Sequence, residues 1–170
     1  MKNRLERVVE IATDAGKEIL DVYENEFDVE VKGDGSPLTE ADRRAHELIL
    51  QRLRHIDPDT PVLSEESGAD VFAQRRRWQR FWLVDPLDGT REFVKRNGEF
   101  TVNIALIEGS SPVLGVVFTP VTGVSHYAAA GLGAFRAGPD GKPTPIRVKK
   151  LDHKRVIMVA SRSHALSLAL

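Results

Sequence analysis

Residues 81–90 read Phe-Trp-Leu-Val-Asp-Pro-Leu-Asp-Gly-Thr, and they predict the central strand of a sheet followed by an acidic turn. Its first four residues are apolar without a break, a pattern typical of a strand that is covered on both faces of a sheet. We expect this strand to stop at Asp85. A second short strand is expected over 61–64, and Glu65 and Glu66 follow it directly. The sequence therefore predicts a sheet in which neighbouring strands end in carboxylates.

The rest of the sheet is expected downstream, where apolar runs are separated by glycine and proline. The connections over 109–112 and 120–123 are short enough for hairpins, which favours antiparallel neighbours. Residues 68–80, which precede the strand expected over 81–84, are polar and are expected to be irregular. The expected downstream strands cover 101–108, 113–119, 124–129 and 133–136.

Two amphipathic helices are expected before the sheet. Apolar residues recur at helical spacing over 5–22 and again over 41–53, and the Asp-Pro pair at 57–58 ends the second helix. Between the helices, residues 29–32 alternate like a short strand and residues 33–37 are interpreted as a loop. Helices followed by an antiparallel sheet predict a layered α+β fold, here as one domain over the whole chain.

Composition narrows the possible functions. The chain has 170 residues with a formal net charge of -1, and 41% of them are hydrophobic, as in an ordinary globular domain. The absence of cysteine excludes disulfides, cysteine-ligated metals and a cysteine nucleophile. No apolar run approaches the ~18 residues of a membrane span, and the N-terminus has no secretory signal, so we expect a cytoplasmic protein. None of the five histidines has metal-ligand spacing, and they are interpreted as surface or core residues.

The acidic turn over 85–90, after the strand expected over 81–84, is the strongest candidate for a catalytic or metal site. Asp85 and Asp88 are placed so that both carboxylates can converge on one hard cation, and a backbone carbonyl between them can turn inward. An all-oxygen site of this kind suits Mg²⁺. The N–H groups of Gly89 and Thr90 can hold a phosphate at a helical turn, and glycine allows a close approach. The alternative is a plain Asp-capped turn.

The spacing of this turn argues against a covalent aspartyl phosphate. Phosphatases with an aspartyl nucleophile use Asp-x-Asp-x-Thr after a buried strand. When that pattern is placed on Asp88 and Thr90, the attacking position falls on Pro86, which cannot attack phosphorus. The spacing therefore favours a metal-activated water.

Two further acids are candidates for the same site. Glu65 can complete a cation site with Asp85, because adjacent strands that both end in carboxylates place them side by side. A solvated acidic pair on a loop is the alternative. Asp42 lies three residues after Thr39, so it can close a capping box, or it can face the site and orient an attacking water through Thr90. The spacing alone favours the cap.

Several motifs resemble the inositol monophosphatase superfamily of Mg²⁺-dependent, lithium-sensitive phosphatases. They lie at 63–66 (Leu-Ser-Glu-Glu) and 82–90, and the segments at 36–42, 91–106 and 161–164 are similar to the branch of bacterial 3′(2′),5′-bisphosphate nucleotidases. The resemblance implies a layered α/β sandwich of the sugar-phosphatase type. It also implies hydrolysis of 3′-phosphoadenosine 5′-phosphate to AMP and phosphate, a reaction of sulfur metabolism.

The same resemblance implies a role for each site residue. The substrate would be a small phosphorylated nucleotide, and a peripheral location at the inner membrane is implied beside the cytoplasmic one. The implied roles are metal ligand for Glu65, Asp85, the Leu87 carbonyl and Asp88; substrate contact for Glu65, Leu87, Asp88, Gly89 and Thr90; and positioning of the catalytic water for Asp42 and Thr90.

The family also has a second α/β half that carries a Trp-Asp-x-Ala-Ala-Gly-like motif, whose aspartate is a further metal ligand. No such motif precedes the end of this chain at Leu170. Residues 156–160 are interpreted as another buried strand and 161–164 as a turn or helix cap, where a covering helix would begin. We therefore expect a truncated domain with an incomplete metal site, for which both an active and an inactive chain stay open, and a half-covered sheet that exposes apolar surface.

Other functions stay open on the sequence alone. An inositol- or sugar-phosphate phosphatase would use the same scaffold. A non-catalytic fragment that binds a nucleotide or a metal would show saturable binding without turnover. Nucleic-acid binding is disfavoured, because a net charge of -1 gives no general attraction to phosphates.

Overall fold

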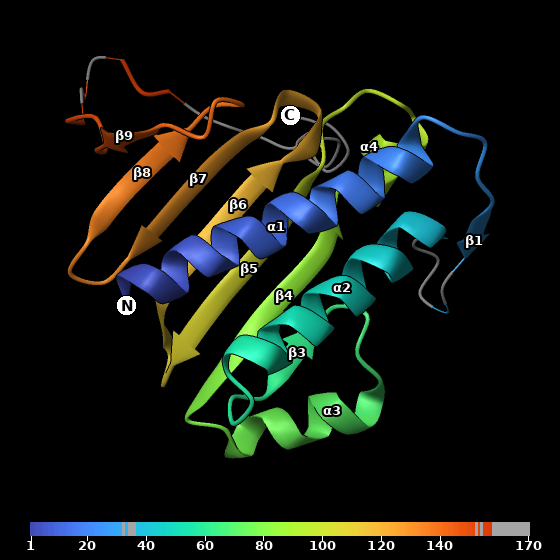
Figure 1. Ribbon diagram of the computed structural model, residues 1–170, viewed down its shortest axis with the longest axis horizontal. Helices are drawn as coiled ribbons and strands as arrows, with labels where there is room; N and C mark the ends of the chain where they lie inside the picture. Colours follow the sequence, from blue (N-terminus) through green and yellow to red (C-terminus); the bar gives the residue numbers. More distant parts are fainter. Residues whose placement is uncertain (32, 34–36, 152, 154, 158–170) are drawn as a thin grey trace.

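The computed structural model describes residues 1–31, 33, 37–151, 153 and 155–157 (Figure 1). Its helices are α1 (Lys2–Tyr23), α2 (Glu40–Ile56), α3 (Ala69–Gln74) and α4 (Thr90–Val94), with short 3₁₀ turns η1 (Arg75–Arg77) and η2 (Pro120–Thr122). Its strands are β1 (Val29–Val31), β2 (Pro37–Thr39), β3 (Val62–Ser64), β4 (Arg80–Asp88), β5 (Thr101–Glu108), β6 (Ser111–Thr119), β7 (Val124–Ala129), β8 (Gly133–Ala137) and β9 (Pro143–Ile146).

The strands form one large sheet and one small one. The large sheet has the order β3-β4-β5-β6-β7-β8-β9, and the small sheet pairs β1 with β2. Neighbours in the large sheet run antiparallel, except β3 and β4, which are parallel. The expected antiparallel sheet and the hairpin that joins β5 to β6 are therefore confirmed.

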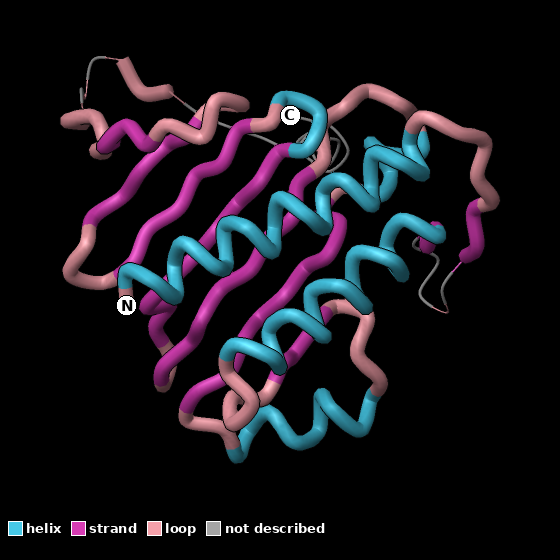
Figure 2. The backbone as a smooth tube through the Cα atoms, viewed as in Figure 1, coloured by secondary structure: helices cyan, strands magenta, loops and turns pink. Residues whose placement is uncertain are grey.

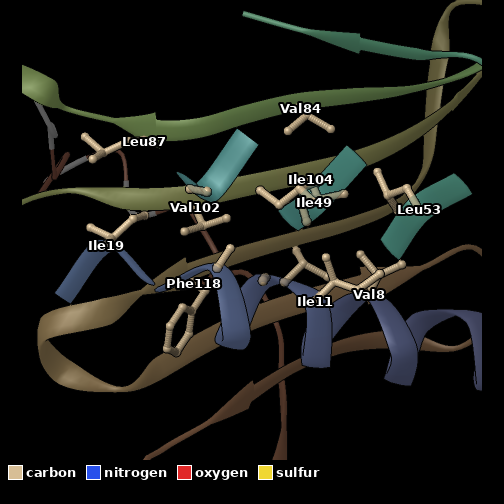
Figure 3. Close-up of a cluster of buried hydrophobic side chains, with 14 of the residues drawn as sticks. Val8, Ile11, Ile19, Ile49, Leu53, Val84, Leu87, Val102, Ile104 and Phe118 are labelled. Carbon is tan, nitrogen blue, oxygen red and sulfur yellow. The ribbon is translucent and has the colours of Figure 1, made fainter. Parts of the chain in front are cut away.

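Helices α1 and α2 lie side by side across one face of the large sheet (Figures 1 and 2). Each turns the predicted apolar stripe toward the strands. In Figure 3, Ile11 of α1 and Ile49 of α2 lie near Ile104 and Phe118 of the sheet, within one cluster of buried side chains. Full burial of such a side chain contributes about 1.5–3 kcal/mol, so this layer supplies most of the driving force for folding. The layered α+β class is confirmed.

Helix α2 begins with the predicted capping box. The backbone N–H of Thr39 donates to Asp42 Oδ2 at 2.7 Å, and the Thr39 hydroxyl donates to the same oxygen at 2.6 Å. The helix ends at Ile56, with Asp57 as its C-cap, because the ring of Pro58 disfavours helical backbone in the residue before it. Asp42 is thereby held in a fixed orientation at the start of α2.

Strand β4 is longer than expected and is covered on one face only. It continues past the predicted stop at Asp85, with a register shift against β5 between Asp85 and Asp88. Trp82 and Val84 are buried in the core, whereas Leu83 between them is 43% exposed. Successive side chains of a strand point to opposite faces, and α1 and α2 cover only one of them. The expectation of a strand covered on both faces is therefore wrong.

Two segments upstream of β4 also differ from expectation. Residues 68–80, expected to be irregular, contain α3 and η1. None of the residues in α3 is buried, so no apolar periodicity marks this helix in the sequence. Pro37, expected in a loop, begins β2.

Most of residues 156–164, for which a strand and a turn were expected, lie outside the described part of the chain. The strand expected over 156–160 extends beyond the described residues, and the turn expected over 161–164 lies outside them. The two described residues at the start of that strand, Val156 and Ile157, are exposed and belong to no strand.

The face of the large sheet away from α1 and α2 carries a hollow of about 680 Å³. Small and apolar side chains line it, including Leu83, Ala105 and Val117. Val117 is 42% exposed, similar to Leu83. The hollow reaches Glu65 and Asp85 at the ends of β3 and β4. The described residues thus show the apolar exposure that was expected of a half-covered sheet.

No helix in the described part of the chain is long and apolar enough to cross a bilayer. The cytoplasmic location stays a prediction. No observation on the described residues supports the peripheral location at the inner membrane.

Candidate active site

The parallel pair β3 and β4 brings two of the predicted acids together. In its register Ser64 pairs with Val84, so Glu65 and Asp85 come next on their strands at the same edge of the sheet. The Glu65 N–H continues the ladder by donating to the Val84 carbonyl at 3.0 Å. Their predicted placement side by side is present in the structure.

Asp85 lies in an environment that disfavours its charge. Burial, the nearby charges of Glu65 and Asp88, and a hydrogen bond with Glu65 raise the pKa of Asp85 to about 8, while a backbone hydrogen bond at Leu87 opposes the change. The Oδ1 atom of Asp85 is buried and has no hydrogen-bond partner. Without a cation, Asp85 therefore keeps its proton at neutral pH, and a cation bound between the carboxylates would favour its ionised form.

Asp88 is held by a residue that the sequence analysis did not single out. Asn103 pairs with Asp85 across β4 and β5, and its Nδ2 donates to Asp88 Oδ2 at 3.0 Å. The Thr101 hydroxyl donates to Asn103 Oδ1 at 3.1 Å, which fixes the orientation of the amide. The only signal in the sequence is the alternation of β5, which places Asn103 on the open face of the sheet.

Asp42 and Thr90 meet as the site hypothesis requires. The Thr90 hydroxyl lies 3.3 Å from Asp42 Oδ1 and 3.2 Å from the Leu87 carbonyl oxygen, and it donates its one proton between these two acceptors. Asp42 Oδ2 meanwhile accepts the two capping hydrogen bonds from Thr39. The cap and the contact with the site are therefore compatible, because they use different oxygens of one carboxylate.

Gly89 is required where β4 turns into α4. Its φ of 96° lies in the left-handed region, and a Cβ built on it would lie 2.9 Å from the Glu99 carbonyl oxygen. Glycine alone tolerates both conditions. The turn brings the first backbone N–H groups of α4, which have no partner within the helix, to the acidic edge of the sheet.

His46 is part of the same neighbourhood, although it was interpreted as an ordinary surface or core residue. It lies one turn after Asp42 on α2, and its Nδ1 is 2.9 Å from the Ser64 hydroxyl. Ser64 is fully buried and directly precedes Glu65. Nothing in the spacing of the sequence indicates this contact, because the two residues are 18 positions apart.

The donor set fits a hard divalent cation only in part. Among the described residues, no group of three or more carboxylates, histidines or cysteines is arranged to hold a metal ion. The Leu87 carbonyl, predicted as a ligand, accepts the Thr90 hydroxyl with one lone pair and has a second, and its ligand role stays a prediction. Glu65 and Asp85 do fit, since they supply only oxygen and Asp85 Oδ1 lacks a partner.

The layers of this fold and the acidic ends of β3 and β4 place the chain in the sugar-phosphatase-like class of layered α/β proteins. The chain belongs to the inositol monophosphatase family, whose model matches residues 1–168.

Three relatives are each similar to most of this chain. The 3′(2′),5′-bisphosphate nucleotidase CysQ of Salmonella typhimurium is 49% identical over 162 residues, which cover 94% of this chain and 64% of the relative. The crystal structure of CysQ from Bacteroides thetaiotaomicron is 41% identical with a TM-score of 0.69, covering 89% of this chain and 54% of that one. An inositol monophosphatase of Thermotoga maritima is 30% identical with a TM-score of 0.74, over 87% and 54%. The chain thus spans between one half and two thirds of the length of these relatives.

Proposed function

We propose that residues 1–170 form a metal-dependent phosphatase domain that removes the 3′-phosphate of 3′-phosphoadenosine 5′-phosphate, giving AMP and phosphate. One observation carries the proposal. Partly buried Asp85 lies with Glu65 and Asp88, burial and these two acids raise its pKa to about 8, and the turn after it carries Thr90, whose hydroxyl contacts Asp42. An acid held under such repulsion, followed in the chain by a hydroxyl that is oriented by a second acid, suits water-based attack on a phosphate with the help of a cation.

Glu65, Asp85, the Leu87 carbonyl and Asp88 would hold Mg²⁺. The cation would neutralise phosphoryl charge and lower the pKa of a bound water. The Leu87 carbonyl has two lone pairs, so it could hold the cation while the Thr90 hydroxyl stays 3.2 Å away. Mg²⁺ is preferred over softer metals because every one of these ligands is an oxygen.

Asp42 and Thr90 would position the attacking water. The Thr90 hydroxyl donates to Asp42 Oδ1, so the lone pairs of its oxygen are left to accept a hydrogen bond from a water. Gly89 and Thr90 would contact the phosphate through their backbone N–H groups at the start of α4. The water oxygen would form the new bond to phosphorus and release a proton, the bond between phosphorus and the 3′-oxygen would break, and the 3′-oxygen would take up a proton to become the hydroxyl of AMP.

The relatives support the choice of substrate. Proteins named 3′(2′),5′-bisphosphate nucleotidase CysQ are 48–49% identical to this chain over 94–95% of its length. The solved inositol monophosphatase from Thermotoga maritima is only 30% identical. An inositol phosphate is the second candidate substrate, because that structure superposes with the higher TM-score of 0.74.

The test is phosphate release by the 170-residue chain, with and without Mg²⁺, from 3′-phosphoadenosine 5′-phosphate and from inositol 1-phosphate. We expect Mg²⁺-dependent release from the nucleotide by the unaltered chain and by Asp59→Asn, which changes an exposed acid between α2 and β3 that is not among the proposed site residues. We expect none from Asp85→Asn. Equal turnover in Asp85→Asn overturns the proposed site, and preference for inositol 1-phosphate overturns the proposed substrate. A folded chain that binds nucleotide without turnover is a binding module, not the proposed phosphatase.

A further inference from the structure

We propose that His46 is a positioning residue, which fixes the backbone on either side of Glu65 so that its carboxylate is held beside Asp85. The inference rests on the proposed function, since it assigns a purpose to the orientation of a proposed metal ligand. It starts from one contact between His46 Nδ1 on α2 and the Ser64 hydroxyl at the end of β3, at 2.9 Å.

The contact is one of a pair made by the same helix. Asp42 and His46 are four residues apart on α2, so their side chains lie one above the other on one face. Asp42 contacts Thr90 after β4, and His46 contacts Ser64 at the end of β3. Two consecutive turns of α2 therefore hold the two chain segments that carry the candidate ligands.

The Ser64 hydroxyl accepts one hydrogen bond, and it needs His46 as the acceptor for its own proton. Ser64 is fully buried, and its Oγ accepts the N–H of Glu66 at 3.4 Å. The hydroxyl proton is then left to be donated, and His46 Nδ1 is the acceptor within reach. We assign the ring proton to Nε2 from this balance of donors and acceptors. Burial lowers the pKa of His46, which agrees with a neutral ring that accepts at Nδ1.

Further hydrogen bonds fix the turn that follows. The Ser64 N–H donates to Ser67 Oγ at 3.0 Å, and the Ser67 N–H donates to the Ser64 carbonyl at 3.0 Å. Glu65 lies inside this turn, with its own N–H bonded to the Val84 carbonyl at 3.0 Å. The backbone of Glu65 is thus fixed from both sides, and His46 is the link from this turn to α2.

Loss of this link should loosen the turn without changing the charge of the site. A buried donor left without an acceptor would then move to find a new partner, and the turn over 64–67 would move with it. Groups that orient a metal ligand in this way typically change metal affinity about 10- to 100-fold when they are removed. A histidine that served only for packing would not produce this specific loss.

The first test uses the full 170-residue chain and Mn²⁺, which occupies magnesium sites and can be followed by its electron spin resonance. We expect His46→Leu to weaken Mn²⁺ binding about 10-fold, and His46→Asn, whose amide oxygen can accept the Ser64 hydroxyl, to restore most of the affinity. The matched control is His55→Leu, an exposed histidine of the same helix, which should bind as the unaltered chain does. Unchanged Mn²⁺ affinity in folded His46→Leu overturns the inference.

A second measurement needs no metal and separates this inference from the proposed function. We expect amide hydrogen exchange at Glu65, Glu66 and Ser67 to accelerate at least about 10-fold in His46→Leu and in Ser64→Ala, and not in His55→Leu. If the unaltered chain neither binds Mn²⁺ nor releases phosphate, the proposed function fails, and the exchange rates still decide the positioning role. Exchange at these three amides that is the same in His46→Leu as in the unaltered chain overturns it.

Discussion

Asp85, a proposed metal ligand, would stabilise a bound cation, but its charge destabilises the free chain. Its carboxylate lies with Glu65 and Asp88, and burial adds to the cost of its charge. Without a cation, these repulsions oppose folding at every pH where the acids are ionised. Residues of this kind commonly exchange stability for function.

The first prediction follows from this conflict. In EDTA at pH 9, Asp85→Asn should raise Tm by about 2–4 °C, which corresponds to about 1 kcal/mol for a chain of this size. Mg²⁺ should then raise the Tm of the unaltered chain and leave that of Asp85→Asn unchanged, because only a state that binds the ion is stabilised by mass action. Calorimetry of both proteins checks it, and a lower Tm for the variant in EDTA would contradict it.

The second prediction concerns the charge of His46. Burial lowers the pKa of His46 from 6.5, with Arg54 acting in the same direction and Glu66 and Glu47 opposing it. The unfolded chain therefore binds this proton at a higher pH than the folded chain does. The stability due to the neutral ring is fully present above about pH 6.5 and is lost as the pH falls below it.

Urea unfolding between pH 5 and pH 8 measures this effect. His46→Asn should flatten the fall in the free energy of unfolding below pH 6.5, because its amide does not titrate there. His55→Asn, which removes an exposed histidine from the same helix, should keep the slope of the unaltered chain. An identical slope in all three proteins would show that His46 does not contribute.

At the scale of elements, the turn from β4 to α4 gives the third prediction. Gly89→Ala places a methyl group 2.9 Å from the Glu99 carbonyl oxygen at a φ of 96°, so we expect a loss of about 2–4 kcal/mol. Gly109→Ala, at a φ of 60° with nothing within 4 Å of its Cβ, should cost only about 1 kcal/mol. Equal losses in urea unfolding would mean that the close approach at Gly89 is relieved by movement of the chain.

The elements also show what could be predicted from the sequence. Strands β5 and β7 were predicted to the residue, since turn signals bound their apolar runs. Helix α3 was missed because none of its residues is buried, and β4 was ended early because a carboxylate at Asp85 was taken as a stop. A polar residue near the end of a strand can still pair its backbone, as Asp85 of β4 does with Asn103 of β5.

The candidate site was predictable only in part. The acids at the ends of β3 and β4 follow from the strand pattern, and the cap at Asp42 follows from its spacing to Thr39, whereas only the family resemblance implied that Asp42 faces the site. Asn103 and His46 were not found as site residues, because their contacts to Asp88 and Ser64 span 15 and 18 positions. Such contacts depend on how the elements pack, so the spacing of residues in the sequence does not predict them.

At the scale of the whole molecule, the open face of the large sheet yields the fourth prediction. Leu83 and Val117 are 43% and 42% exposed beside the hollow of about 680 Å³. The chain should bind a dye that reports apolar surface, such as bis-ANS, and Leu83→Lys should reduce its fluorescence at least about twofold. Val121→Lys, at a residue that is 46% exposed and does not line the hollow, is the matched control. Equal fluorescence of the three proteins would contradict the prediction.

The sheet order has a consequence for how the molecule folds. Strands β4 to β9 pair with their neighbours in sequence, so this meander closes only short loops and should form early. The contact of Asp42 with Thr90 joins residues 48 positions apart, and it exists only after α2 has docked. We therefore expect protection of the amides of β5 to β8 to appear first in pulsed hydrogen exchange during refolding, and the burial of Trp82 under the helices and the acidic centre to come last. A chain arrested just before that step would contain most of its strands and none of its chemistry.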